Sequence, residues 1–318
     1  MVVTRRLPEP VQQALTQAFD ARLNPDDRPL TTDGLRAALQ QADALLTTVT
    51  DKVTADVLAV EPRRAGLVAN FGVGFNNIDI EAAKARGVAV SNTPDVLTDA
   101  TADLAITLLL MVARRTGEGE RHLRGGQWAG WRPTHMLGTH VTGKTLGLVG
   151  MGRIARAVAQ RAHHGFGMKI IFHDPYPPSA DVAASLGAEP RATLEEVLRE
   201  ADFVSLHCPA TPETRHLMNR ERFGLMRPDA FLVNTARGDV VDEAALVEAL
   251  QAARIAGAGL DVYEKEPQVT QALVSMDNVV LLPHLGSATH ETRVAMGMRA
   301  VENLQRFFAG QPLRDRVV

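Results

Sequence analysis

The chain of 318 residues has the length of about two domains of roughly 150 residues each. Its hydrophobic fraction of 45% and charged fraction of 22% are typical of globular proteins, which argues against a disordered or fibrous chain. The 34 basic and 37 acidic residues give a net charge of -3, and 4% of residues are aromatic. There is no excess positive charge to bind a phosphate backbone, so we expect no nucleic-acid partner.

The cellular compartment is indicated by the scarcity of cysteine and by the lack of signal-peptide and membrane-spanning patterns. Its single cysteine, Cys208, cannot form an internal disulfide, which fits a reducing compartment. The first ten residues lack the apolar core of a signal peptide, and the longest apolar run, residues 104–113, is too short to span a bilayer. We therefore expect a cytoplasmic protein with no membrane partner.

Short apolar runs alternate with amphipathic segments in the first hundred residues. The runs at 44–49, 66–71 and 87–92 predict buried strands, and residues 78–87 predict a helix. This alternation is typical of a parallel sheet that helices cover on both faces. Residues 99–115 then predict a long helix, apolar nearly all round and therefore buried.

The segment 124–143 is the least periodic part of the chain. It carries five glycines and both tryptophans, Trp128 and Trp131. Large aromatic side chains on an irregular segment need a surface against which they can be buried. We predict a subunit contact, and hence a homodimer; packing against the same chain is the alternative.

Strand-like runs resume after Gly143 and predict a second α/β domain. Six strands are expected, at 144–150, 168–174, 202–207, 230–236, 255–262 and 279–284. A sheet of this size has room for a full dinucleotide-binding fold. A final helix is expected from Ser287 to about Ala309.

A glycine turn follows the first of these strands, in TLGLVGMGRIARAVA. Gly150 and Gly152 permit a tight turn and a close approach of the backbone to a pyrophosphate, and the small Ala155 lets the helix pack on the strand. Asp174 ends the next strand, 22 residues after Gly152. A carboxylate there accepts hydrogen bonds from a ribose diol and repels a 2′-phosphate, so the motif favours NAD. Arg153 leaves NADP open, and an ordinary strand-to-helix turn is the simpler alternative.

Three further strand ends carry residues suited to catalysis or substrate binding: Arg237, Glu266 and His284. Ligands of open parallel sheets bind at the carboxyl ends of the strands, where these residues should converge. Histidine suits general acid–base work, and a neighbouring carboxylate favours its charged form and orients it. The planar guanidinium of arginine suits the carboxylate and carbonyl oxygens of a 2-oxo acid. Singly, each residue could instead be a surface or capping group.

The remaining histidines are weaker candidates. His163 and His164 are adjacent on a helix and should point apart, whereas His173 and His207 end strands and should neighbour the cofactor. No HExxH or cysteine-rich spacing is present, so we expect no metal site.

Long motifs over most of the chain resemble those of the D-isomer-specific 2-hydroxyacid dehydrogenases, especially the glyoxylate/hydroxypyruvate reductase branch. The motifs are NFGVGFNNID, SNTPDVLTDATADLA, GKTLGLVGMGRIARAVA, HCPATPETRHLMN, VNTARGDVVDEAAL, GLDVYEKEP and LLPHLGSAT. The resemblance implies an oxidoreductase with two Rossmann-like, doubly wound parallel-sheet domains. An NAD-binding domain, residues 99–286, would be inserted into a discontinuous substrate-binding domain, residues 1–98 and 287–318.

The resemblance also implies residue roles. Arg237 would bind substrate, Glu266 would support the histidine, and His284 would donate the proton. The backbone amides of Val73 and Gly74 would hold the substrate carboxylate, as consecutive N–H groups can, although Gly72 and Gly74 could be turn glycines only. The family positions expected to touch NAD match Thr101, Arg153, Ile154, Asp174, Cys208, Thr214, Thr235, Ala236, Asp261 and Gly286.

Two departures from the family pattern bear on the substrate. Asp95 stands where glycine is common, and the loop at Phe75 differs from many relatives. Our hypothesis is an enzyme that reduces a small 2-oxo acid such as glyoxylate or hydroxypyruvate with NADH. The alternatives are phosphoglycerate dehydrogenase or another D-2-hydroxyacid dehydrogenase, and an NAD-sensing binding protein related to corepressors. Formate dehydrogenase pairs its histidine with glutamine, so Glu266 argues against it.

Overall fold

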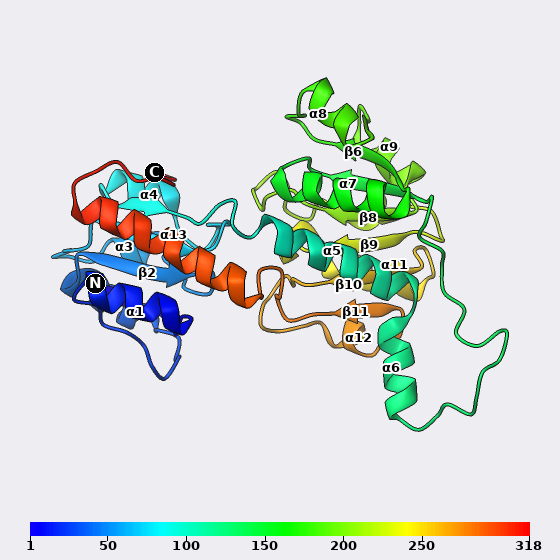
Figure 1. The fold of residues 1–318 in the computed structure, drawn as a ribbon, viewed down its shortest axis with the longest axis horizontal. Coiled ribbons are helices and arrows are strands. Elements are labelled where there is room, and N and C mark those ends of the chain that lie inside the picture. The colour runs from blue at the N-terminus through cyan, green and yellow to red at the C-terminus, as the bar shows by residue number, and fades with distance from the viewer. The chain divides into compact units, whose positions relative to one another are not determined.

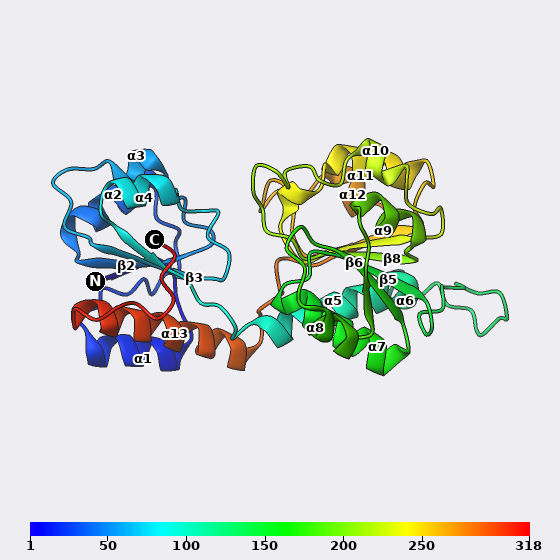
Figure 2. The same ribbon diagram turned by 90° about the horizontal axis from the view of Figure 1, so that it is seen from above.

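The computed structural model describes residues 1–318, which form two compact units. The first consists of Met1–Leu97 and Ser287–Val318, and the second of Thr98–Gly286. Each unit is a parallel sheet with helices on both faces (Figures 1 and 2). The predicted doubly wound α/β class is confirmed. No helix is long and apolar enough to cross a membrane.

The first unit has a four-stranded sheet of order β1-β2-β3-β4. Its strands are β1 Val2–Val3, β2 Ala44–Thr48, β3 Leu67–Phe71 and β4 Ala89–Ser91. Its helices are α1 Glu9–Ala18, α2 Thr32–Gln41, α3 Ala55–Leu58, α4 Ile80–Ala85 and α13 His290–Phe308. Figure 2 shows α1 and α13 on one face of the sheet and α2, α3 and α4 on the other. The segment around Arg316 runs antiparallel beside Ser91 at the free edge of β4.

The second unit has a seven-stranded sheet of order β11-β10-β9-β8-β5-β6-β7, parallel throughout. The strands are β5 Thr145–Val149, β6 Lys169–His173, β7 Ala188–Pro190, β8 Phe203–Leu206, β9 Phe231–Asn234, β10 Gly257–Leu260 and β11 Val279–Leu281. The chain leaves β5 on one side for β6 and returns to its other side at β8. This is the topological switch point at which doubly wound sheets bind ligands.

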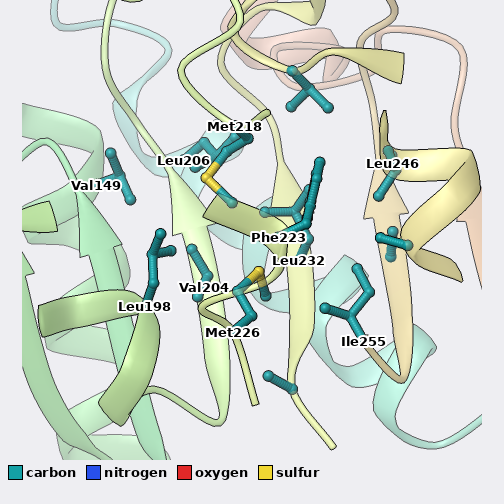
Figure 3. Packing of buried hydrophobic residues seen from close by; sticks show 14 of the residues in the cluster. Val149, Leu198, Val204, Leu206, Met218, Phe223, Met226, Leu232, Leu246 and Ile255 are labelled. Atoms are coloured by element: carbon teal, nitrogen blue, oxygen red, sulfur yellow. The ribbon is translucent and has the colours of Figure 1, made fainter. Parts of the chain in front are cut away.

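Helices cover both faces of this sheet. They are α5 Thr98–Ala113, α6 Thr116–Arg124, α7 Arg153–Phe166, α8 Ala180–Ser185, α9 Leu194–Glu200, α10 Arg220–Phe223, the 3₁₀ turn Gly238–Val240, α11 Glu243–Gln251 and α12 Gln271–Val274. One core lies between the strands and α9, α10 and α11, where Leu198, Phe223 and Leu246 pack on Val204 and Leu232 (Figure 3). A second core lies under α5 and α7.

Several sequence expectations need correction. The strands β1 and β7 were not predicted, because two or three residues are too few to show a period. The helix α13 begins at His290 rather than Ser287, and the Thr289 hydroxyl caps it by accepting from the Thr292 amide at 3.1 Å. The helix α5 is not buried all round within its unit, because Ile106, Leu110 and Met111 are only partly buried.

Candidate active site

The glycine turn between β5 and α7 leaves space at the switch point, beside the first amides of α7. Gly150 has φ +88°, and a Cβ there would lie 3.0 Å from the Cys208 amide nitrogen, so only glycine fits. A Cβ at Gly152 would meet nothing within 4 Å. Gly152 is the N-cap residue of α7 and has no side chain that could accept from the amides of the first helical turn. The open space and these amides fit a pyrophosphate.

The carboxylate of Asp174 is held beside this turn. One oxygen accepts from the Met151 amide at 2.6 Å and the other from the Tyr176 amide at 2.7 Å. A carboxylate oxygen has more than one acceptor site, so both oxygens can still take a ribose hydroxyl. Asp174, which was predicted from its spacing to Gly152, is therefore oriented by hydrogen bonds from backbone amides.

The neighbouring strand ends contribute a buried hydroxyl and a neutral thiol. Thr235 Oγ1, just after β9, is buried with no hydrogen-bond partner, as expected of a group that meets a ligand. Burial raises the pKa of the Cys208 thiol to about 11, so it is protonated at neutral pH. Ala236 is partly buried next to Thr235, and Ile154 is partly buried in the first turn of α7. Together with the glycine turn, these residues fit a dinucleotide.

Two expected cofactor residues have structural contacts of their own. Thr214 Oγ1 donates to the Pro209 carbonyl at 2.6 Å and accepts from the Thr211 amide at 2.8 Å, so it closes its own loop. The buried Asp261 accepts from the amides of Leu285 at 2.6 Å and Gly286 at 2.8 Å. Burial raises the pKa of Asp261, and these two hydrogen bonds offset only part of the rise.

Thr101 and Asp261 lie beside Gly286. A Cβ on Gly286 would be 3.3 Å from Asp261 Oδ2 and 3.5 Å from Thr101 Cγ2. The His284 amide donates to the Asp261 carbonyl at 2.9 Å. Asp261 therefore holds the backbone of residues 284–286. Besides its predicted contact with NAD, Asp261 thus helps to position His284.

Glu266 and His284 meet, as the sequence predicts. Glu266 Oε2 lies 2.8 Å from His284 Nδ1, and Glu266 Oε1 accepts from the Tyr263 amide at 3.1 Å. Burial raises the pKa of Glu266, but the hydrogen bonds from His284 and Tyr263 outweigh it, so the pKa lies below its usual value. His284 has φ +56°, a left-handed conformation that is uncommon for a residue with a side chain and is found at functional sites.

Arg237 follows β9, the strand beside β10. Its Nη1 donates to the Ala236 carbonyl at 2.6 Å, and its own carbonyl accepts from Asn234 Nδ2 at 2.9 Å. Burial lowers the pKa of Arg237, and the charges of Glu266 and Asp239 oppose that change. A guanidinium that has lost water in this way gains from an anionic ligand.

A third acid, Glu243, supports the segment that carries Glu266 and was not singled out from the sequence. This buried side chain accepts from the Glu264 amide at 2.6 Å and from the Thr270 hydroxyl. The backbone of the Arg237 turn packs against the same segment, because a Cβ on Gly238 would collide with the Tyr263 carbonyl group. The sequence signal that could have revealed Glu243 was its place in the VDEAAL motif, at the start of an apolar helix.

Structural partners exist for the four histidines that the sequence made weaker candidates. The rings of His163 and His164 are in edge contact with centroids 4.9 Å apart, so the expectation that they point apart is wrong. His173 Nδ1 lies 3.2 Å from the Arg191 carbonyl, and His207 Nε2 lies 2.9 Å from Ser205 Oγ. Desolvation lowers the pKa of His207 to about 4, which keeps its ring neutral at physiological pH.

The predicted carboxylate-binding amides belong to the first unit, in the loop after β3. Neither the Val73 amide nor the Gly74 amide donates a hydrogen bond within the unit. A Cβ on Gly72 would lie 2.7 Å from Val49 Cγ1, so glycine is required for the loop to pack here. The loop therefore offers two consecutive donors.

Comparison with known proteins assigns a family to this architecture. Residues 106–286 match the model of the D-isomer specific 2-hydroxyacid dehydrogenase NAD-binding domain. The chain is 46% identical to a glyoxylate reductase of Thermococcus kodakarensis over 97% of its length and 93% of the relative. A Pyrococcus furiosus glyoxylate reductase is 45% identical, over 97% and 92%.

Solved structures give the same result. The TT0316 protein of Thermus thermophilus superposes with a TM-score of 0.90 at 43% identity, covering 100% of this chain and 99% of that one. An NADPH-dependent glyoxylate/hydroxypyruvate reductase of Sinorhizobium meliloti, in complex with NADP and malonate, has a TM-score of 0.89 at 36% identity, covering 100% and 96%.

Proposed function

The chain belongs to the D-isomer specific 2-hydroxyacid dehydrogenase family, and we propose that it reduces a small 2-oxo acid of the glyoxylate or hydroxypyruvate type to the 2-hydroxy acid. The observation that carries the proposal is the 2.8 Å contact between Glu266 and His284, on the sheet whose switch point has the glycine turn. The names of the relatives support this substrate class.

The cofactor in this proposal is NAD. The glycine turn, Thr235 and Asp174 would hold it, and when bound in reduced form it supplies a hydride to C2 of the oxo acid. Both oxygens of Asp174 are already oriented by backbone amides, which places a negative charge where a 2′-phosphate would have to lie. We therefore propose a preference for NADH, with NADPH as the weaker alternative.

His284 is the proposed proton donor. Its Nδ1 faces Glu266, so Nε2 is the nitrogen free to give a proton to the oxygen on C2. The lowered pKa of Glu266 keeps that carboxylate charged at neutral pH, and its contact with Nδ1 orients the imidazole ring. Asp261, through the amides of residues 284–286, positions the ring.

Arg237 and the amides of Val73 and Gly74 would bind the substrate carboxylate. The desolvated guanidinium provides a planar pair of donors, and the loop provides two backbone donors. In this proposal, residues 1–98 and 287–318 act as the substrate-binding domain and residues 99–286 as the NAD-binding domain.

The proposed function is tested by steady-state kinetics over a panel of 2-oxo acids. Glyoxylate, hydroxypyruvate and pyruvate would each be measured with NADH and with NADPH. We expect the highest kcat/KM for glyoxylate or hydroxypyruvate with NADH. Binding of NADH without turnover of any acid would instead favour a sensing protein and refute the proposal.

We further propose that the protein is a cytoplasmic homodimer. The support is an irregular segment on which Trp131 is 82% exposed and Trp128 55% exposed, next to the exposed Leu123 and Leu137. Apolar side chains gathered in this way favour burial against another subunit. Light scattering at micromolar concentration should give twice the chain mass, and a monomer would overturn the assignment.

A further inference from the structure

The three carbonyls of the Gly72–Gly74 loop are each held by a different donor. The Gly72 carbonyl accepts from the Thr93 amide at 3.0 Å, and the Val73 carbonyl accepts from Asn92 Nδ2 at 2.8 Å. The Gly74 carbonyl accepts from Asn70 Nδ2 at 2.9 Å. The contacts come from β3 and from the segment just after β4, and they are all on the carbonyl side of the loop.

Anchoring a carbonyl also fixes the amide of the next residue. A trans peptide is planar, and its C=O and N–H bonds point in opposite directions. The Thr93 amide therefore sets the direction of the Val73 N–H, and the Asn92 side chain sets the direction of the Gly74 N–H. Both N–H groups face away from the groups that hold the loop, and neither donates within the unit.

We infer that Asn92 is a positioning residue that turns the Gly74 amide toward the substrate carboxylate, with Asn70 fixing the end of the same loop. The inference rests on the proposed function, and it adds a residue that never touches substrate. Asn92 is itself held, because its amide donates to the Asp315 carbonyl at 3.2 Å. Without the Asn92 side chain, the Val73–Gly74 peptide could rotate and present its carbonyl oxygen to an anion.

Asn92→Asp is the sharpest test, because the size is unchanged while the donor becomes an acceptor that repels the Val73 carbonyl. We expect KM for glyoxylate to rise at least about 10-fold, kcat to stay within about 3-fold, and KM for NADH to be unchanged. Asn92→Ala should give a smaller rise, because it removes the hydrogen bond without adding repulsion. Thermal unfolding of each variant establishes that it is folded.

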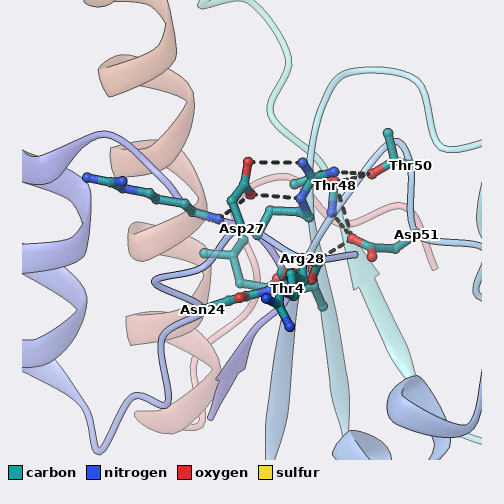
Figure 4. Close-up of polar contacts among 10 residues, drawn as sticks. Thr4, Asn24, Asp27, Arg28, Thr48, Thr50 and Asp51 are labelled. Atoms are coloured by element: carbon teal, nitrogen blue, oxygen red, sulfur yellow. Dashed lines mark hydrogen bonds and ion pairs between the residues drawn. The ribbon is translucent and has the colours of Figure 1, made fainter. Parts of the chain in front are cut away.

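The preference of the enzyme for a substrate with a carboxylate is a readout that a general loss of protein stability would not change. Methylglyoxal has a reactive carbonyl but no carboxylate, so kcat/KM for glyoxylate relative to methylglyoxal should fall about 10-fold in Asn92→Asp. Asn24→Asp is the matched control. Asn24 Nδ2 donates to the carbonyls of Thr4 and Arg28, both at 2.7 Å, and not to the carbonyls of residues 72–74 (Figure 4). This control should leave the ratio unchanged.

Two outcomes separate this inference from the proposed function. If the wild type reduces glyoxylate and Asn92→Asp keeps both KM and the acid preference, the inference is wrong and the function stands. Calorimetric titration of oxamate into the NADH-loaded protein tests binding without turnover. Weaker oxamate binding by Asn92→Asp supports the inference even if the wild type fails to reduce any acid, whereas equal binding overturns it.

Discussion

The two sheets of this protein are both parallel but have different chemistry at the carboxyl ends of their strands. After β2, the buried Asp51 accepts from the Thr4 hydroxyl at 2.5 Å and from the Thr48 amide at 2.7 Å, and Thr48 and Thr50 hydroxyls are 2.9 Å apart (Figure 4). After β9 in the other sheet, the Thr235 hydroxyl has no partner and Arg237 is desolvated.

This difference shows how the strand ends that bind a ligand can be distinguished from those that only stabilise the fold. Polar groups that satisfy one another stabilise a fold and leave fewer donors and acceptors for a ligand. Groups that are buried without partners, or that face open space as Gly152 does, are kept despite a loss of stability. In the first unit the groups of the second kind include the amides of Val73 and Gly74. They also include three buried side-chain atoms without a hydrogen-bond partner, Arg63 Nε, Asn77 Oδ1 and Thr93 Oγ1.

The largest expected effect comes from the catalytic end of the second sheet. His284→Ala should lower kcat by about 10²- to 10⁴-fold, the usual contribution of a general acid, with little change in binding of NADH. Stopped-flow measurement of NADH oxidation and fluorescence titration of NADH would check both. His164→Ala, on the exposed surface of α7, is the matched histidine control. Near-normal turnover of His284→Ala would contradict the assignment.

Acid should weaken the second unit at a higher pH than the first. The pKa of His207 is lowered to about 4, so the unfolded chain takes up a proton near pH 6.5 while the folded chain does not. Stability is therefore lost as pH falls from about 6.5 to 4, by at most about 3 kcal/mol. In urea unfolding across this range, His207→Asn should flatten the pH dependence.

The first unit should respond in the carboxylate range. Burial raises the pKa of Asp315, but the hydrogen bonds from Arg299 and Asn303 outweigh it and leave the pKa below its usual value. The stability that this acid contributes is present above about pH 4 and is lost as pH falls further. A first unit that unfolds before the second at pH 5 would contradict this contrast.

A smaller effect is expected at Glu243. Glu243→Leu removes the acceptor for the Glu264 amide and the Thr270 hydroxyl, so unfolding free energy should fall by about 1 to 3 kcal/mol. The segment carrying Glu266 would also loosen, and the pH profile of kcat should shift with it. A variant with reduced stability and an unchanged pH profile would show that Glu243 only stabilises the fold.

The smallest expected effect is at Asp95, which has φ +72° in the first unit. Glycine adopts this conformation without a steric penalty, which explains why glycine is common here in the family that the sequence resembles. Asp95→Gly relieves that strain but loses the 3.7 Å ion pair with Arg299. The two changes oppose each other, and the net change in calorimetric stability should be below about 1 kcal/mol.

The sequence was sufficient for the interior strands and the central site. Residues such as Leu146 and Val233 lie in apolar runs long enough to be recognised, and the meeting of Glu266 with His284 follows from the ends of parallel strands. Sequence could not show Glu243 or Asn92 as supporting residues, because their role depends on which backbone group folds against them. The exposed side of α5 was also missed, because the helix is mostly apolar, although Asp99, Asp103 and Thr107 lie on one side of it.

Residues 315–318 pair with β4, and this short segment has two structural roles. The Val317 amide donates to the Val90 carbonyl and the Val90 amide donates to the Val318 carbonyl, so this edge of the sheet is closed to the addition of another strand. The same segment supports Asn92 through the Asp315 carbonyl. Deleting residues 315–318 would expose the edge of β4 to aggregation and remove a support of the Gly72–Gly74 loop, so the truncated protein should lose both solubility and affinity for acids.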